Sequence, residues 1–267
     1  MQTGISTASL FMRRNNEDAL PLFNDLGVPT AEVFLTSFSE YGAEFGNLLA
    51  QRKGNVKVNS VHILNTQFEP QLFSAHERVK ADCYGWLDKV LDSANALGAP
   101  YYTFHGTARY KQSARDPRND RFDRMGIQLA EISNFCKNKG VTLCLENVEW
   151  ATYNRVGVYQ ELKKYAPSLR GVLDIKQARL AGEGYEAYLA EMGEDIAYVH
   201  ISDVDEKGRI RLPGQGIFDF ETLLKRLQDV GFDGALLIEV YKENYAEERE
   251  LKTSCDFVQE LIYKLGC

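Results

Sequence analysis

Six side chains of the kinds that bind metal ions each stand at the end of a short apolar run. They are His62 after "VNSV", His105 after "YYTF", Glu146 after "VTLCL", Asp174 after "GVL", His200 after "IAYV" and Glu239 after "ALLI". A single strand-end acid is more often a helix cap, and a single histidine is often a satisfied core residue. Six such residues, all at the end of an apolar run, are hard to explain in this way and favour a common site instead. Carboxylate and imidazole groups together suit a divalent metal such as Mn, Co, Zn or Mg.

The apolar runs alternate with longer amphipathic stretches along the whole chain. The runs expected to be strands are Thr3–Leu10, Ala31–Thr36, Val56–Leu64, Tyr101–His105, Val141–Asn147, Gly171–Asp174, Ile196–Ser202 and Ala235–Tyr241. The stretches expected to be helices are Asn15–Leu26, Tyr41–Gln51, His76–Leu97, Arg121–Lys139, Val156–Tyr165, Ala178–Met192, Phe220–Val230 and Ala246–Leu265. The strands are apolar on both faces, which is typical of a parallel sheet covered by helices.

Eight strand–helix alternations without a break in composition predict an α/β fold, a single (β/α)8 TIM barrel in one domain spanning residues 1–267. The rival is a doubly wound open sheet, which usually has a glycine-rich phosphate loop after its first strand. The segment "STASLFMRR" has none. In a barrel all strands end at one face, so side chains far apart in sequence can reach a common centre. The longest irregular stretches, Asn65–Ser74, Gly106–Pro117 and Asp203–Ile217, all follow strands, where a barrel places its active-site loops.

The bulk composition is that of an ordinary soluble globular protein. The 267 residues are 44% hydrophobic and 26% charged, and the net charge of -7 argues against a nucleic-acid binder, which usually has a basic stripe. Five cysteines without a CxxC pair favour a reduced, cytoplasmic protein. No apolar run approaches the roughly 20 residues of a membrane span, so no membrane association is expected.

Six motifs, in order along the chain, resemble the xylose isomerase-like TIM-barrel superfamily. They are "TFHGT", "LCLENVEW", "GVLDIKQARLAG", "YVHISDVD", "LPGQGIFDF" and "ALLIEVY". The superfamily contains sugar isomerases and epimerases, inosose dehydratase-like proteins and endonuclease IV. The resemblance implies one divalent metal ion held by Glu146, Asp174, His200 and Glu239. In the keto-sugar epimerases, which this pattern resembles, the two glutamates also act as acid and base.

The nuclease branch of the superfamily builds a three-zinc cluster, and this chain matches it incompletely. The third zinc would need a histidine three residues after Asp174, where the chain has Gln177, and an Asp-x-His pair in the loop after His200, where none occurs. His62 and His105, with Glu146, do match the ligands of another zinc, so a second metal near them stays an open alternative. Around a single metal they are expected to support the ligands or to hydrogen-bond substrate.

Further side chains are candidates for contact with substrate. Gln177 can donate and accept hydrogen bonds but cannot act as an acid or base near neutral pH, so we expect a positioning role. Lys176 is either a surface lysine or a group at the mouth of the site, and Gln215 lies in the loop "LPGQG". Arg211 and Arg109 are candidates to meet an anionic group of the substrate, and Trp150 and Phe68 are candidates for the pocket wall.

The leading hypothesis is a metal-dependent isomerase or epimerase of a sugar or sugar phosphate. Proton abstraction next to a carbonyl would give an enediolate, with Glu146 and Glu239 serving the two faces of the carbon. The alternatives are an inosose or dehydroshikimate-type dehydratase, an endonuclease IV-like nuclease, and a non-catalytic sugar-binding barrel. The expected partner is a small polyhydroxylated substrate, and the family often forms homo-oligomers.

Overall fold

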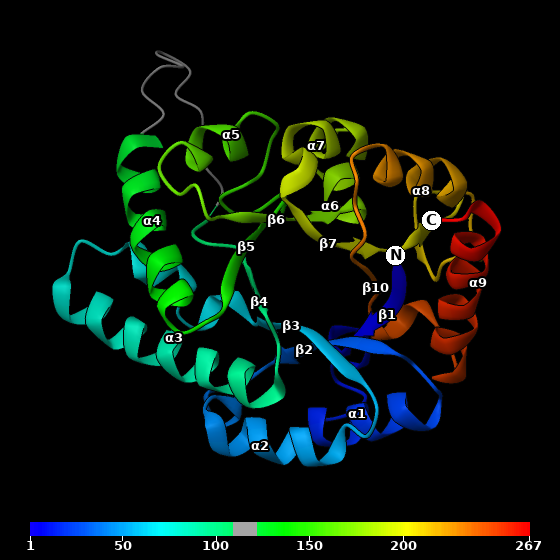
Figure 1. Ribbon diagram of the computed structural model, residues 1–267, viewed down its shortest axis with the longest axis horizontal. Coiled ribbons are helices and arrows are strands. Elements are labelled where there is room, and N and C mark those ends of the chain that lie inside the picture. Colours follow the sequence, from blue (N-terminus) through cyan, green and yellow to red (C-terminus); the bar gives the residue numbers. More distant parts are fainter. Residues whose placement is uncertain (109–121) are drawn as a thin grey trace.

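The computed structural model describes residues 1–108 and 122–267, and within them eight parallel strands close a barrel (Figure 1). The strands follow one another around the barrel in chain order. They are β1 (Gln2–Ser6), β2 (Thr30–Leu35), β3 (Lys57–Ile63), β4 (Tyr101–Phe104), β5 (Thr142–Glu146), β6 (Arg170–Asp174), β7 (Ile196–Ile201) and β10 (Ala235–Ile238). The predicted (β/α)8 barrel is confirmed.

Helices surround the barrel and cover its strands (Figure 1). They are α1 (Asn16–Asp25), α2 (Ala43–Arg52), α3 (Glu77–Leu97), α4 (Phe122–Asn138), α5 (Val158–Lys163), α6 (Ile175–Leu180), α7 (Tyr185–Met192), α8 (Phe220–Asp229) and α9 (Arg249–Leu265). None of the helices in the described residues is long and apolar enough to cross a membrane.

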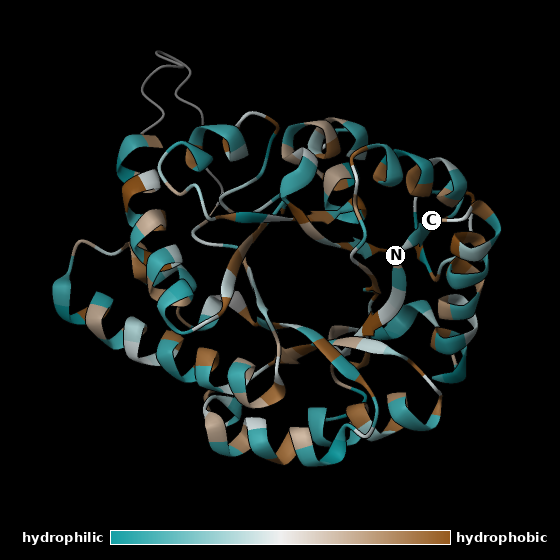
Figure 2. Ribbon diagram, viewed as in Figure 1, coloured by the Kyte–Doolittle hydropathy of each residue, from teal (hydrophilic) through white to brown (hydrophobic). Residues whose placement is uncertain are grey.

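The core lies between the helices and the outer side of the barrel. Every residue of β2 and β7 is buried, as expected for strands covered on both faces. Helix α8 buries Phe220, Leu223, Leu224 and Leu227, which recur at helical spacing and form one apolar stripe. Figure 2 shows hydrophilic residues recurring along the outer helices. The alternation of buried and exposed positions along each helix therefore fixes which side faces the barrel.

The stretch Ala178–Met192, expected as one helix, forms two helices. Helix α6 begins three residues earlier than predicted because Asp174 caps it, with Oδ1 accepting the backbone N–H of Gln177 at 2.8 Å. The chain then breaks before α7 at Gly182, whose φ of +81° lies in the left-handed region that glycine adopts without a steric penalty. The earlier start matters for the site, because it fixes the directions of Lys176 and Gln177.

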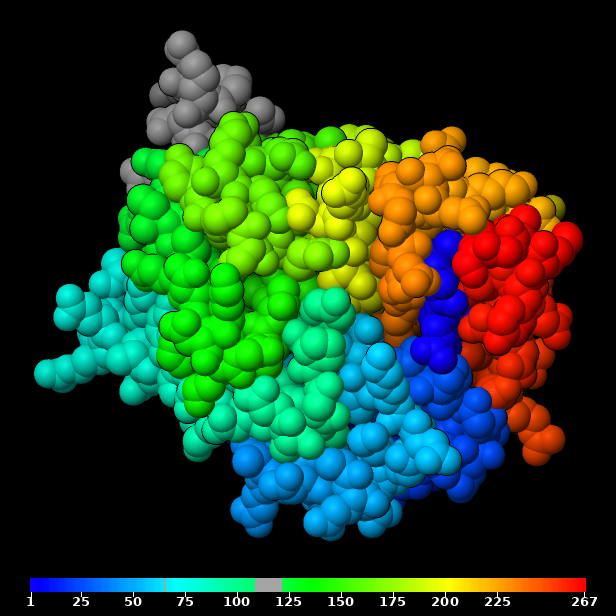
Figure 3. Space-filling view, viewed as in Figure 1, coloured from blue at the N-terminus to red at the C-terminus, as the bar shows by residue number. Residues whose placement is uncertain are grey.

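The N-terminus lies at the end of the barrel where the strands begin. Figure 3 shows the first residues (blue) between the segment around β10 (orange) and α9 (red). Gln2 of β1 is in register with Ala235 of β10, and the terminal amino group of Met1 pairs with Asp233. Because the strands are parallel, the side chains at their carboxyl ends lie at the opposite end of the barrel.

The loop after β7 is held by one buried carboxylate. It contains a short hairpin of β8 (Asp203–Val204) and β9 (Ile210–Arg211). The carboxylate of Asp203 accepts the backbone N–H groups of Gly214, Gly216 and Phe218 at 3.0, 2.9 and 2.9 Å, and that of Val204 at 2.7 Å. These bonds fold residues 203–218 into a compact loop at the rim of the barrel.

Candidate active site

The carboxyl ends of four neighbouring strands bring four ligand-type side chains together. Glu146 ends β5, Asp174 ends β6, His200 lies in β7 and Glu239 directly follows β10. Each offers one ligand atom, and these atoms all lie within 4.8 Å of one another. Because β5, β6, β7 and β10 are consecutive around the barrel, the strand order itself produces this convergence.

Asp174 uses its two carboxylate oxygens differently. Oδ1 caps α6, whereas Oδ2 is buried without a hydrogen-bond partner and lies 4.0 Å from Nδ1 of His200. Burial and the charges of Glu146 and Glu239 raise the pKa of Asp174 to about 7, although Lys176 opposes them. Capping a helix and binding a cation are therefore compatible roles for this residue, because one oxygen is available for each.

Each of the two glutamates has close cationic or imidazole neighbours. Glu146 lies 2.8 Å from Nδ1 of His200 through Oε1 and 3.0 Å from Nε2 of His105 through Oε2. Burial alone would raise the pKa of Glu146, but these two histidines hold it well below its ordinary value. Burial would likewise raise the pKa of Glu239, but Lys176 and His200 lower it. Both side chains are therefore carboxylates near neutral pH.

Lys176 lies inside the site and not on the surface. Its side chain is buried, with Nζ 2.9 Å from Oε2 of Glu239 and 3.7 Å from Oδ2 of Asp174. Burial alone would lower the pKa of Lys176, but Glu239 and Asp174 outweigh burial and raise it. The ammonium group thus neutralises part of the negative charge that the carboxylates bring to the barrel.

The four-residue set fits a divalent cation. Three carboxylates face one lysine, so the group keeps a negative charge that a cation would compensate. Oδ2 of Asp174 is buried without a hydrogen-bond partner, and a cation would satisfy it. Oxygen ligands with a single imidazole suit Mn, Co, Zn or Mg.

His62 and His105 form a second group against Glu146. Their Nε2 atoms lie 3.0 Å apart, and Nε2 of His105 is also 3.0 Å from Oε2 of Glu146. Burial alone would lower the pKa of His105, but its contacts with Glu146 and Glu69 outweigh burial and raise it to about 10. The three side chains converge closely enough to hold a cation of their own.

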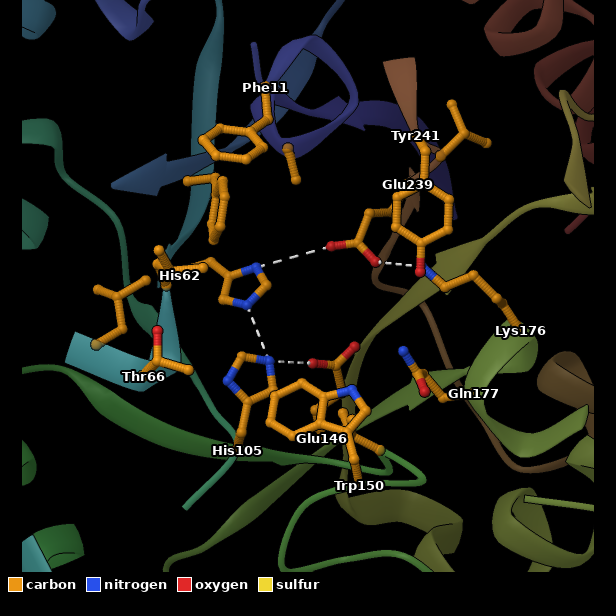
Figure 4. A pocket seen from close by; sticks show the side chains of 16 residues that line it. Phe11, His62, Thr66, His105, Glu146, Trp150, Lys176, Gln177, Glu239 and Tyr241 are labelled. Carbon is orange, nitrogen blue, oxygen red and sulfur yellow. Dashed lines mark hydrogen bonds and ion pairs between the residues drawn. The ribbon is translucent and has the colours of Figure 1, made fainter. Parts of the chain in front are cut away.

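A cavity of about 400 Å³ opens onto these residues (Figure 4). Its polar lining includes His62, His105, Glu146, Gln177 and Glu239. The remaining lining is Ala8, Phe11, Phe34, Ile63, Leu64, Thr66, Val148, Trp150, Lys176, Val240 and Tyr241. The volume suits a small ligand, which the polar side chains of the lining could contact.

Some side chains that the sequence suggested lie elsewhere. Arg211 pairs with Asp205 at 3.0 Å, and Gln215 is hydrogen-bonded to Glu250 at 3.4 Å, so neither lines the cavity. Phe68 is a buried core residue and does not line the cavity, whereas Trp150 does line it. Of these four residues, only Trp150 is therefore placed to contact a substrate in the cavity. Arg109 lies outside the described residues.

Two fully buried glutamates stand behind the histidines, and the strand-end pattern did not reveal them. Glu32 lies within β2, and Glu69 lies in a short 3-10 helix after β3. Glu69 accepts the backbone N–H of His105 at 3.0 Å and the hydroxyl of Tyr102 at 2.7 Å. For Glu32, a carboxylate inside the apolar run "TAEVFL" was the available signal.

The chain is similar over most of its length to one known protein family. The sequence profile of that family, described as xylose isomerase-like TIM barrel, matches residues 20–261. An uncharacterized protein of Methanocaldococcus jannaschii is 24% identical, in an alignment covering 98% of this chain and 96% of that protein. The L-ribulose-5-phosphate 3-epimerase UlaE of Shigella flexneri serotype 5b is 25% identical, covering 73% of this chain and 69% of the epimerase.

Solved structures share the same fold at lower sequence identity. D-psicose 3-epimerase of Clostridium cellulolyticum H10, solved with D-tagatose, superposes with a TM-score of 0.76 at 16% identity over 100% of both chains. The IolI protein, solved with a bound zinc atom, superposes with a TM-score of 0.77 at 17% identity over 99% of both chains. These likenesses establish the barrel fold.

Proposed function

This chain belongs to the xylose isomerase-like TIM-barrel family, and from that premise we propose that it is a divalent-metal-dependent epimerase or isomerase of small sugars. One observation carries the proposal: Glu146 and Glu239 enter the same cavity, and each also belongs to the four-residue ligand set. Figure 4 shows the two carboxylates on different sides of the space between them. A sugar carbon placed there would have a carboxylate near each face.

The two glutamates would exchange protons with the substrate carbon. One carboxylate removes the proton next to the carbonyl, and the other returns a proton to the opposite face, which inverts that carbon. Contacts with His200 and His105 for Glu146, and with Lys176 for Glu239, keep the pKa of each carboxyl low enough for it to start as a base. The arrangement does not distinguish which glutamate acts first.

Glu146, Asp174, His200 and Glu239 would hold the divalent cation. When bound there, it would polarise the carbonyl and its neighbouring hydroxyl and stabilise the enediolate. Gln177, which lines the cavity beside these residues, would hydrogen-bond a sugar hydroxyl and fix the carbon between the glutamates. The aromatic side chains of Phe34 and Trp150 would exclude water from the face of the sugar.

Unphosphorylated keto-sugars are the first substrates to test. The described lining of the cavity includes no arginine, its lysine is held by Glu239, and its imidazole of His105 is held by Glu146, so each of these groups already has an anionic partner in place of a phosphate. The curated relatives include L-ribulose-5-phosphate and fructoselysine 3-epimerases, which makes carbon 3 of a 2-keto-sugar the proposed reacting centre. The corresponding sugar phosphates are tested beside them for comparison.

A dehydratase is the second candidate, because His105 lies beside Glu146. The contacts with Glu146 and Glu69 raise the pKa of His105 to about 10 despite its burial, so its imidazole carries a proton near neutral pH. Such a group could protonate a departing β-hydroxyl after the first proton is abstracted. An inosose or dehydroshikimate-type substrate would then lose water, and the configuration of the reacting carbon would not be inverted.

Incubation of the metal-loaded protein with keto-sugars, inososes and their phosphates separates the two candidates. The proposal expects epimeric or isomeric products of unchanged mass, identified by chromatography. A product lighter by one water, with absorbance from a conjugated carbonyl, would establish the dehydratase instead. Binding of all these compounds without any conversion would contradict both and support a sugar-binding barrel.

A further inference from the structure

Glu32 is a carboxylate in the interior of the barrel that does not reach the cavity. It is fully buried in β2 and is absent from the cavity lining. An ionised carboxylate in a protein interior is strongly unfavourable unless nearly all of its hydrogen-bonding capacity is used. An apolar side chain would fill the same volume without that penalty. The presence of an acid at this position therefore requires a physical explanation.

The surrounding strands supply donors to both oxygens of Glu32. Ser6 of β1 donates to Oε1 at 2.9 Å, whereas Ser60 of β3 and Thr103 of β4 donate to Oε2 at 2.8 and 2.5 Å. Because the Thr103 hydroxyl donates to Glu32, the neighbouring hydroxyl of Tyr198 must donate to Thr103. Four strands thus build a dedicated polar cage around one carboxylate.

The remaining contacts of Glu32 are with the imidazoles of the site. Oε1 lies at ion-pair distance from two imidazoles, 3.1 Å from Nε2 of His200 and 3.4 Å from Nδ1 of His62. Both nitrogens are buried and make no hydrogen bond in this structure, so the carboxylate of Glu32 is the acceptor beside them. A carboxylate oxygen faces a ring nitrogen favourably only when that nitrogen carries a proton. Nδ1 of His200 lies 2.8 Å from Oε1 of Glu146 and by the same rule also carries a proton while no cation is bound. A cation held by Glu146, Asp174 and Glu239 would displace that proton and leave the one on Nε2, which faces Glu32.

We propose that Glu32 is a positioning residue of the metal centre, which fixes the ring orientation and tautomer of His200 so that Nδ1 is presented as a ligand. The inference rests on the metal site of the proposed function and adds a residue that never touches metal or substrate. Carboxylates that accept the second N–H of a ligating histidine usually matter for metal affinity by about 10- to 100-fold.

Glu32 also lies close enough to His62 and Glu239 to form a ligand set with them, but its oxygens are already occupied. Oε2 accepts two hydroxyl protons, and Oε1 accepts a third beside the two imidazoles. A carboxylate enclosed in this way acts through the histidines and does not bind the ion itself. Metal stoichiometry distinguishes a direct ligand from a residue that acts through the histidines. If Glu32 were a direct ligand, its substitution would remove one bound ion per chain. If it acts through the histidines, the number of bound ions stays the same.

Glu69 provides a matched control. It is as deeply buried as Glu32 and lies 3.4 Å, through Oε2, from Nδ1 of His105, which is outside the four-residue ligand set. The substitutions Glu32→Gln and Glu69→Gln therefore make the same chemical change behind two different histidines. Glu32→Gln should fold, because the hydroxyls of Ser60 and Thr103 can rotate to accept from the new amide.

The first test is titration of Mn²⁺ into the metal-free wild type and both variants at one pH. We expect Glu32→Gln to weaken binding at least about 10-fold with unchanged stoichiometry, and Glu69→Gln to stay within about threefold of wild type. Equal affinities for wild type and Glu32→Gln, or equal losses in both variants, would overturn the inference. Failure of the wild type to bind any metal would instead refute the metal site of the proposed function, and this inference with it.

The second test needs no variant and decides the matter if Glu32→Gln does not fold. Long-range 1H–15N spectra of zinc-loaded protein labelled at histidine would resolve four rings, with the exposed His76 as the reference. The inference expects His200 to keep a slowly exchanging proton on Nε2 while Nδ1 is bound to zinc. Ligation through Nε2, or rapid exchange of its proton, would overturn it.

Discussion

The ammonium group of Lys176 lies 2.9 Å from Oε2 of Glu239, with its side chain buried at the carboxyl end of the barrel. The pair exists because Asp174 caps α6 and starts that helix at Ile175, which turns Lys176 inward. The proposed base Glu239 is thus held by a residue of α6, the helix that the proposed metal ligand Asp174 caps.

Replacing Lys176 by methionine should shift the pH dependence of catalysis. Burial raises the pKa of Glu239, and Lys176 is the main influence that lowers it, so removing the ammonium group raises that pKa. Glu239 must be deprotonated to act as a base, and the acidic limb of the kcat/KM profile should therefore move to higher pH. The surface variant Lys264→Met is the control, and an unshifted limb in Lys176→Met would contradict this role.

Gln177→Ala should affect binding more than chemistry. The side chain lines the cavity but cannot transfer protons, so its loss removes a hydrogen bond that substrate and transition state share. We expect KM to rise by about 10-fold, with kcat within about threefold of wild type. Steady-state kinetics on the preferred sugar give both values. A selective fall in kcat would show that Gln177 acts in the chemical step.

Metal removal should both inactivate and destabilise the protein. At a metal concentration 100-fold above Kd, binding contributes about 2.7 kcal/mol, which corresponds to about 5–10 °C in Tm for a chain of this size. Because a cation competes with the proton on Asp174, whose pKa is raised to about 7, affinity should fall as pH decreases through this value. Thermal unfolding with and without chelator, repeated at several pH values, measures both effects. A Tm that does not respond to metal would contradict the site.

Asp203→Ala should loosen the loop after β7. Its buried carboxylate accepts four backbone N–H groups, and hydrogen bonds to a charged group contribute about 1.5–3 kcal/mol each before water replaces some of them. We expect the free energy of unfolding in urea to fall by about 2–4 kcal/mol. Glu206→Ala, an exposed residue of the same loop, is the control and should change the midpoint little. Equal effects of the two substitutions would refute the special role of Asp203.

The sequence allowed the barrel and the convergence of the strand-end side chains to be predicted for one physical reason. Parallel strands of a barrel end at a common face, so residues such as Glu146 and Glu239 are brought together by topology alone. The rule depends only on where strands end, and the ends of apolar runs are visible in a sequence. One-residue errors, as at His105 just after β4, did not affect it.

Features that depend on side-chain direction could not be predicted in the same way. Lys176 faces the site because α6 starts at Ile175, and the sequence pattern suggested a start at Ala178. Arg211 pairs with Asp205 across the β8–β9 hairpin, which the loop composition did not indicate. Glu32 lies in the middle of its strand, where a rule about strand ends does not apply.

The most direct test of the two-glutamate mechanism is deuterium incorporation from D2O into a substrate found by the sugar screen, measured at metal concentrations that saturate each variant. We predict that the wild type labels the reacting carbon without loss of water. Glu146→Gln and Glu239→Gln should each slow turnover at least about 100-fold while their circular dichroism spectra stay unchanged. The surface variant Glu131→Gln should match the wild type. Near-wild-type turnover in either cavity variant, or turnover without deuterium in the product, would contradict the mechanism.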